Sequence, residues 1–305
     1  MNPHNHQPVL KENTYTSFDG DTFPYLSWAP EKKSISTVLI GFHGISGAAD
    51  DYKNLANALQ KESPNIAVYS PNLRGQGRDP IQSRRGDLAH PHTWFRDAHT
   101  FTRLVRERHP EARIIWCGES MGSLIALHAT VSKENQSPPC DALILSSPVV
   151  HISPEKLSPA KRFGLRVVAT LFPKARVSLE GISGAEQTKV TNDTIHQEQV
   201  NHNDWHVPRF TLRLLRHLER LISEMPAQAS KTELPVLLLH GGRDVFSHPE
   251  DIVRFEKNFP GTTTVQRQYY PQSYHLLFYD DAREHIFSDI SRWLGGAEHQ
   301  HPATR

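Results

Sequence analysis

The 305-residue sequence has only two cysteines, almost no net charge and no long apolar run. Cys117 and Cys140 cannot form the disulfide framework of a small secreted domain, so we expect a reducing, cytoplasmic location. The formal net charge is +1, which gives no indication of a nucleic-acid partner. No apolar run approaches the roughly 20 residues of a membrane-spanning helix. The first 15 residues lack the apolar segment of a signal peptide, and we expect none.

Histidine is abundant, with 19 residues, so a metal site has to be considered. Four of these histidines lie in polar terminal segments: His4, His6, His299 and His301. His202 and His206 are four residues apart with Asp204 between them, a spacing that could bind a metal on one helix face. Because no further ligand lies nearby to complete a site, we predict solvated polar residues here and no metal.

Short apolar runs alternate with helical patterns along most of the chain, which favours βαβ units and a mostly parallel sheet. The expected strands are 37–42, 66–70, 113–117, 142–145, 236–240 and 264–269. Residues 17–28 alternate around an Asp-Gly turn and predict an antiparallel hairpin. The expected helices are 50–61, 92–109, 121–132, 249–258 and 281–293.

This alternation stops after Ser147 and resumes near residue 233. The intervening stretch predicts helix and loop but no convincing buried strand. It contains two apolar stripes at helical spacing, one through Phe163, Val167 and Leu171 and one from Phe210 to Met225. We therefore predict a core of residues 1–147 and 233–305, with a helical cap of residues 148–232 inserted after the sixth strand.

The sequence Gly118-Glu119-Ser120-Met121-Gly122 lies between an expected strand and an expected helix. Glycine tolerates the backbone angles of tight bends, so an ordinary glycine turn is one explanation. A catalytic explanation is that a strained turn lifts the Ser120 hydroxyl above the sheet edge as a nucleophile. That explanation requires a base within hydrogen-bond reach and an acid that orients the base.

Both partners follow in the order that such a fold uses, acid and then histidine, each after a later strand. Asp244 lies in the loop after residues 236–240, and His275 lies between the last expected strand and the final helix. We therefore predict a triad of Ser120, Asp244 and His275. Weaker alternatives for the base or the acid are His240, His248, Glu250 and Asp251.

An acyl-transfer site also needs donors for an oxyanion. One expected donor is the backbone N–H of Met121, directly after the serine. The other is the N–H of Ile45, in the loop Phe-His-Gly-Ile-Ser-Gly that follows the first parallel strand. The His43-Gly44 pair is also compatible with an ordinary glycine turn.

The chain resembles the α/β-hydrolases, and within them the branch of monoglyceride lipases, lysophospholipases and serine aminopeptidase-like proteins. The segments that carry this resemblance are 42–47, 70–80, 117–128, 145–148, 237–244 and 273–278. The similarity extends from about Phe18 to Trp293. It implies an α/β-hydrolase fold, with Ser120 as nucleophile, Asp244 and His275 as its partners, and Ile45 and Met121 as oxyanion donors.

The sequence departs from the pattern of this branch at three positions. Glu119 replaces the usual histidine before the nucleophile, and Asn72 and Gln76 replace an aspartate and a histidine in the Arg-Gly turn. None of these changes removes a catalytic group. Glu119 is expected to alter the electrostatics beside the nucleophile.

We therefore predict a serine hydrolase that cleaves carboxylic esters through an acyl-enzyme, without a metal or organic cofactor. Monoacylglycerol or lysophospholipid-type lipids are the expected substrates, because the apolar stripes of the cap could line an acyl groove. A serine aminopeptidase or amidase is the first alternative, with Glu180, Glu186 or Glu198 available to bind an α-ammonium group. A non-catalytic ligand receptor is the second. The sequence specifies neither chain length, head group nor oligomeric state.

Four arginines form a basic stripe along the second cap helix: Arg209, Arg213, Arg216 and Arg220. One explanation is a solvated helix face whose arginines pair with nearby glutamates. The other is a transient contact between the cap and an anionic membrane surface. The spacing is compatible with both.

Overall fold

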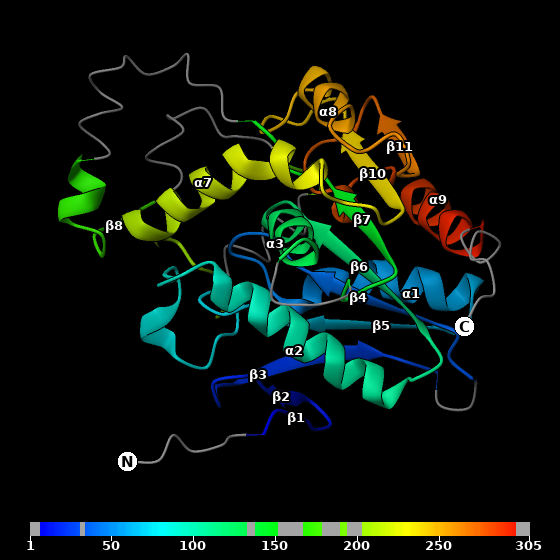
Figure 1. The fold of residues 1–305 in the computed structure, drawn as a ribbon, viewed down its shortest axis with the longest axis horizontal. Helices are drawn as coiled ribbons and strands as arrows, with labels where there is room; N and C mark the ends of the chain where they lie inside the picture. The colour runs from blue at the N-terminus through cyan, green and yellow to red at the C-terminus, as the bar shows by residue number, and fades with distance from the viewer. Residues whose placement is uncertain are drawn as a thin grey trace.

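The computed structural model describes residues 7–30, 34–132, 138–151, 167–178, 190–193 and 203–296. Its centre is a nine-stranded sheet with the order β1-β2-β3-β5-β4-β6-β7-β10-β11 (Figure 1). These strands are β1 (Val9–Leu10), β2 (Thr14–Thr16), β3 (Thr22–Trp28), β4 (Thr37–Phe42), β5 (Ile66–Pro71), β6 (Arg113–Glu119), β7 (Ala142–Ser146), β10 (Val236–Gly241) and β11 (Val265–Tyr270). The strands from β5 to β11 pair in parallel, and β1, β2 and β3 add an antiparallel edge.

Helices cover both faces of this sheet, which confirms the expected α/β class. The helices and 3₁₀ turns are η1 (Ala49–Tyr52), α1 (Lys53–Glu62), η2 (Gln82–Arg84), α2 (His92–Arg108), α3 (Met121–Thr130), α7 (Leu212–Ala229), α8 (Pro249–Glu256), η4 (Leu277–Tyr279) and α9 (Arg283–Gly296). Side chains of α2, α3, α7 and α8 share one buried cluster, and those of α1 and α9 share the other. Neighbouring strand residues alternate between them: Trp116 faces the first cluster and Ile115 the second.

Each expected core strand is present, with ends that differ by at most two residues. The expected hairpin is present as β2 and β3, which pair in antiparallel fashion around Gly20, but its first strand lies before the predicted residues 17–28. Strand β1 has only two residues and was not expected. The chain therefore leaves the sheet after its seventh strand, not after its sixth.

Between β7 and β10 the described residues form a helical turn at 167–171, a two-stranded sheet and helix α7. Strands β8 (Arg176–Val177) and β9 (Phe210–Thr211) pair in antiparallel fashion, and β9 is buried. The prediction of no buried strand in this stretch is therefore wrong at β9. Helix α7 begins after Thr211, whose side chain caps it by accepting a hydrogen bond from the Leu214 N–H.

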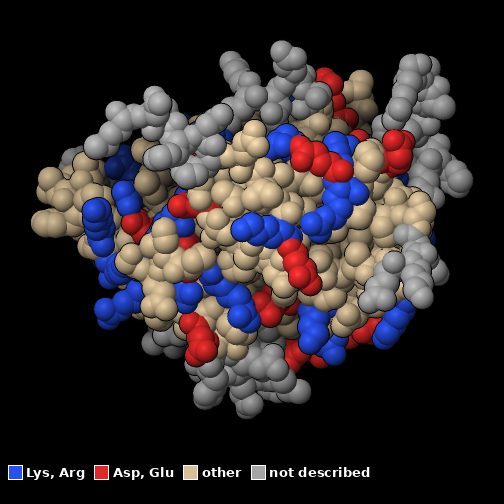
Figure 2. Space-filling view, turned by 90° about the horizontal axis from the view of Figure 1, so that it is seen from below, with Lys and Arg blue, Asp and Glu red and all other residues tan. Residues whose placement is uncertain are grey.

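The apolar stripe expected from Phe210 to Met225 is divided, because Phe210 lies in β9 and the helix begins at Leu212. In α7, Leu214, Leu221 and Met225 are buried against the core, so these side chains do not line the expected acyl groove. In the first stripe, Phe163 lies outside the described residues. Within the described parts of the chain, no helix is long and apolar enough to cross a membrane. On the face seen in Figure 2, basic and acidic side chains are interspersed, in keeping with the net charge of +1.

Parallel pairing brings the carboxyl ends of β4, β6, β7, β10 and β11 to one edge of the sheet. Ligand sites in open α/β sheets form outside this edge. The loops that carry the predicted functional residues begin there, at His43, Ser120, Ser147, Gly242 and Pro271.

Candidate active site

Three predicted residues from three different loops meet in one hydrogen-bonded chain. The Ser120 Oγ lies 2.8 Å from the His275 Nε2, and the His275 Nδ1 lies 2.8 Å from the Asp244 Oδ2. Because the carboxylate can only accept, Nδ1 carries the ring proton and donates it to Asp244, which leaves Nε2 free to accept from the serine hydroxyl. The arrangement has the contacts needed for nucleophilic attack assisted by a base.

The serine occupies a strained position at the junction of β6 and α3. Its φ is 53° and its ψ is −115°, a conformation that non-glycine residues rarely adopt. The flanking glycines allow this turn to pack tightly: a Cβ at Gly122 would overlap the Phe42 carbonyl, and one at Gly118 would overlap the Gly122 backbone. The Ser120 N–H donates to the Ser146 carbonyl at 3.0 Å. The two glycines are therefore required by close backbone contacts on both sides of the serine.

The loop after β10 fixes the carboxylate of Asp244. Its Oδ1 accepts from the Phe246 N–H at 2.8 Å, so Oδ2 remains directed at the imidazole. Ser247 anchors the same loop by donating its hydroxyl to the Pro148 carbonyl at 2.9 Å. The Phe246 ring packs edge-on against His275, with centroids 4.7 Å apart. The side chains of His275 and Asp244 are almost fully buried, which keeps bulk water from their hydrogen bond.

The loop after β4 lies directly against the serine. A Cβ at Gly44 would lie 3.6 Å from the Ser120 Cβ. The N–H groups of Ile45 and Met121 donate to no residue that the structure describes. Both groups are therefore available as donors beside the nucleophile, as predicted, and their use as an oxyanion hole stays a prediction.

His43 was predicted only as part of a turn, but its ring is a fully buried structural element of this loop. The Leu73 N–H donates to His43 Nε2 at 3.1 Å, so the proton lies on Nδ1, which donates to the Gly44 carbonyl at 2.8 Å. Burial lowers the pKa of His43 to about 4. The ring is therefore neutral at physiological pH and holds Gly44 in place.

Glu119 is buried behind the serine on the face of the sheet that carries α1 and α9. Its Oε1 has no hydrogen-bond partner among the described residues. Burial, and after it the nearby Asp51 carboxyl, raise the pKa of Glu119, a backbone hydrogen bond from Phe278 opposes the shift, and the resulting pKa is about 8. Burial likewise raises the pKa of Asp51 to about 7. The expected electrostatic effect of Glu119 thus takes the form of a buried acidic pair.

The other two departures, Asn72 and Gln76, are both buried contacts of the loop after β4. The Asn72 Oδ1 accepts from the Ala49 N–H at 3.1 Å, and its Nδ2 donates to the Pro24 carbonyl at 3.1 Å. The Gln76 Oε1 accepts from the Ser46 N–H at 2.9 Å. The sequence identified these residues only as replacements and gave no signal of their partners.

The proposed weaker alternatives to the triad lie elsewhere. His240 is buried and its Nε2 lies 3.3 Å from a nitrogen of Arg267, and Asp251 pairs with Arg254. His206 lies in the segment between β7 and β10, beside the loop after β4, with its Nδ1 3.3 Å from the Ser46 hydroxyl. In the part of the chain that the structure describes, no group of three or more metal-ligating side chains could hold an ion. His202 and the candidate ammonium ligands Glu180, Glu186 and Glu198 lie outside the described residues.

The basic stripe is divided between different partners. Arg213 forms an ion pair with Asp87, Arg220 pairs with Glu224, and Arg216 donates to Thr170. Arg209 precedes β9 and lies outside α7, so the prediction of one helical stripe of four arginines is wrong at this residue. Arg209, Arg216 and Arg220 remain exposed. The stripe is therefore not a row of four free cations.

Comparisons with known proteins identify the family of the chain. A family model described as "Serine aminopeptidase, S33" matches residues 33–282. A monoacylglycerol lipase from Mycolicibacterium smegmatis is 23% identical over 284 residues, which cover 93% of this chain and 96% of the relative.

Solved structures show the same fold. A soluble variant of monoglyceride lipase from Saccharomyces cerevisiae, in complex with a substrate analog, has a TM-score of 0.76 at 19% identity, covering 96% of this chain and 97% of the other. A carboxyl esterase from Bacillus coagulans in complex with glycerol has a TM-score of 0.74 at 20% identity, covering 95% and 98%. The predicted α/β-hydrolase fold is confirmed.

Proposed function

Because this chain belongs to the serine aminopeptidase family of α/β-hydrolases, we propose that it is a serine hydrolase that cleaves carboxylic esters through an acyl-enzyme. The observation that supports this most directly is the continuous chain of hydrogen bonds from the Ser120 hydroxyl through His275 to Asp244. The second supporting observation is the position of Ser120 at a strained turn, beside two backbone N–H groups that donate to no described residue. A non-catalytic receptor would have no need of this combination.

In the proposed mechanism the Ser120 Oγ attacks the ester carbonyl while the His275 Nε2 takes its proton. The Ile45 and Met121 N–H groups stabilise the oxyanion of the tetrahedral intermediate. His275 then gives the proton to the leaving alcohol, which departs and leaves the acyl group on Ser120. A water molecule, deprotonated by His275, releases the acid in a second round of the same steps. Asp244 stabilises the imidazolium in both.

We propose a monoacyl lipid, such as a monoacylglycerol or a lysophospholipid, as the substrate. The support comes from the relative named monoacylglycerol lipase, which matches over nearly its whole length, and from lipases and esterases among the solved structures with the same fold. An aminopeptidase or amidase is the alternative that the family description suggests. The mechanism uses neither a metal nor an organic cofactor. Both cysteines are buried free thiols, which suits the proposed cytoplasmic location.

The test compares Ser120→Ala with a control, Ser223→Ala, which changes an exposed serine on α7. We expect Ser120→Ala to lower ester turnover by more than about 10⁴-fold, because no other group can form the acyl-enzyme. Covalent labelling by a fluorophosphonate should also disappear, while circular dichroism remains that of the parent. The control should keep both activities. Unchanged labelling of Ser120→Ala would contradict the proposal.

The substrate is tested with a panel of aryl esters of increasing chain length, monoacylglycerol, lysophospholipid and amino-acyl amides. We expect the highest kcat/KM for monoacylglycerol or lysophospholipid and little turnover of the amides. A chelator should leave all rates unchanged. A preference for amino-acyl amides would favour the aminopeptidase alternative while leaving the triad in place.

A further inference from the structure

The loop after β4, which carries the proposed oxyanion donor Ile45, is held from one side by the loop after β5. Contacts between these loops include a backbone N–H of the β5 loop bound to His43 and the amide side chains of Asn72 and Gln76. The backbones also touch, because a Cβ at Gly77 would overlap the Gly47 carbonyl. The β5 loop thus supports the loop after β4 and constrains its backbone.

Gln76 makes the contact that lies nearest the donor. It is fully buried, and its Oε1 accepts from the Ser46 N–H, one peptide beyond Ile45. Ser46 has a φ of 60°, a left-handed conformation that a residue with a side chain keeps only when its surroundings hold it there. The bond to Gln76 fixes the peptide that follows Ile45, and with it the direction of the preceding N–H. The hydroxyl of Ser46 contacts different groups, the Val207 backbone and the His206 ring.

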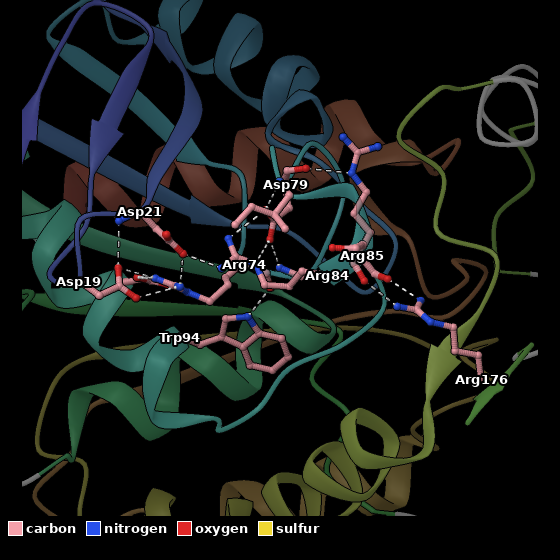
Figure 3. Close-up of polar contacts among 12 residues, drawn as sticks. Asp19, Asp21, Arg74, Asp79, Arg84, Arg85, Trp94 and Arg176 are labelled. Atoms are coloured by element: carbon pink, nitrogen blue, oxygen red, sulfur yellow. Dashed lines mark hydrogen bonds and ion pairs between the residues drawn. The ribbon is translucent and has the colours of Figure 1, made fainter. Parts of the chain in front are cut away.

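Partly exposed ion pairs hold this support to the amino-terminal hairpin (Figure 3), and a buried ion pair holds it to α2. The guanidinium of Arg74 binds Asp97, Asp19 and Asp21. The guanidinium of Arg84 binds Asp79 and Asp21. Gln76 lies in the short stretch between Arg74 and Asp79, and the Asp79 Oδ2 also accepts from the Gly75 N–H at 2.6 Å. The acceptor oxygen of Gln76 is therefore presented from a stretch anchored at both ends.

We propose that Gln76 is a positioning residue for the oxyanion hole: through the Ser46 N–H it holds the peptide that aims the Ile45 N–H at the tetrahedral intermediate. This inference rests on the proposed function, in which that N–H stabilises the oxyanion. Loss of the Gln76 Oε1 acceptor releases Ser46 from its left-handed conformation, and the Ile45 N–H then turns away from the tetrahedral intermediate. Since the oxyanion forms only after attack, the effect falls on kcat and not on KM.

The test replaces Gln76 with Met, which keeps the length of the side chain and removes the acceptor. The control is Gln82→Met, at an exposed position of the same loop. Loss of a whole oxyanion donor costs about 10²–10³ in rate, so a misaligned donor should lower kcat by about 10–100-fold with KM within about twofold. Fluorophosphonate titration counts the folded sites, so that kcat is expressed per active site. The inhibition constant of an alkyl boronic acid, whose serine adduct is tetrahedral, should rise by the same factor as kcat falls.

A second variant, Gln76→Glu, keeps an oxygen acceptor at the same place and should recover most of kcat. If the Met variant does not fold, Gln76→Asn carries the test, because it keeps the amide but withdraws the acceptor by one methylene, and the same loss of kcat is expected. A kcat per active site within twofold of the parent in both Met and Asn, or a boronate affinity that does not change, would overturn the inference. Ser120→Ala separates the two proposals: full turnover in that variant refutes the proposed function itself, whereas its loss beside a fully active Gln76→Met refutes only the positioning role.

Discussion

Glu119, directly before the nucleophile, is expected to make the free energy of unfolding depend on pH. Its carboxyl is buried, lacks a partner for Oε1 and lies near the carboxyl of Asp51. Both pKa values are raised by burial, to about 8 for Glu119 and about 7 for Asp51. The folded protein therefore keeps protons on this pair at a pH at which the unfolded chain has already lost them.

This difference predicts how stability depends on pH. The ordinary pKa of a glutamate is 4.5, so between pH 4.5 and about 8 the folded state binds more protons at Glu119 than the unfolded state does. The free energy of unfolding must then fall as pH rises through this window. We expect Glu119→Gln to flatten the fall, as measured by urea unfolding at pH 5, 7 and 9. Asp51 remains and acts in the same direction, so part of the slope should persist.

The control for this experiment is Glu62→Gln, which changes an exposed glutamate at the end of α1. It should leave the slope of the parent unchanged. An identical pH dependence in Glu119→Gln and the parent would show that Glu119 ionises in the folded protein as readily as in the unfolded chain.

Individual residues also show what the sequence could and could not reveal. Ser120, Asp244 and His275 were identifiable because each lies in the loop after an expected strand, in the chain order serine, acid, histidine that the fold uses. The contact between Gln76 and Ser46 joins loops 30 residues apart and depends on a left-handed φ at a serine, which no local pattern signals. The structural role of His43 was missed for the same reason, because it depends on a hydrogen bond from the Leu73 N–H, 30 residues away.

At the scale of elements, a buried ion pair joins the β5 loop to α2, and partly exposed ion pairs join the same loop to the hairpin β2–β3. Arg74 and Asp97 have side chains only 7% and 5% exposed, and the Arg74 carbonyl accepts from the Trp94 indole N–H at 2.8 Å. A buried charge that loses its partner is far more costly than an exposed one. The position of the β5 loop therefore depends on this pair.

We expect Asp97→Asn to lower the free energy of unfolding by about 3–5 kcal/mol, the usual cost of leaving one member of a buried pair alone. Glu107→Gln is the matched control on the same helix, since it breaks the ion pair between Arg103 and Glu107, whose side chains are 52% and 58% exposed. That change should cost less than about 1 kcal/mol. Urea unfolding of both variants measures the difference. Equal and small effects would show that Arg74 is adequately neutralised by Asp19 and Asp21.

Strands also differ in how well they can be predicted from their sequences. The parallel strands β4, β5, β6, β7 and β10 are largely apolar runs because both their faces are buried, whereas β11 at the sheet edge is polar and partly exposed. The predicted ends of all six were right to within two residues. Strands β1, β8 and β9 have two residues each. Such short strands show no periodicity, and their pairing is decided by contacts with distant segments.

At the scale of the whole molecule, the described part of the segment between β7 and β10 contacts the β5 loop, in addition to the packing of α7 on the core. The Arg176 guanidinium donates to the Arg85 and Ser83 carbonyls (Figure 3), and Asp87 binds both Thr211 and Arg213. The same loop therefore supports the proposed oxyanion hole on one side and the described part of the predicted cap on the other. Arg213 serves this attachment and is not a free surface cation.

The exposed part of the basic stripe predicts the behaviour of the molecule at a lipid surface. Helix α7 carries Glu219 and Glu224 beside its arginines, and Arg220 is already paired with Glu224. We therefore expect the triple change of Arg209, Arg216 and Arg220 to Gln to alter affinity for anionic vesicles by less than about twofold. The control removes the same charge from α2, α8 and α9, by changing Arg103, Arg254 and Arg292 to Gln.

The size of the loss in vesicle affinity distinguishes the two explanations of the stripe. If the three arginines docked on anionic lipid, each could contribute about 1 kcal/mol, and their removal would weaken vesicle binding by about 100-fold at low salt. Sedimentation with vesicles of phosphatidylserine and phosphatidylcholine measures this loss, and turnover of a soluble short-chain ester shows that the site is intact. A large loss confined to the α7 variant would establish the stripe as a membrane contact, whereas equal small losses in both variants identify it as a solvated helix face.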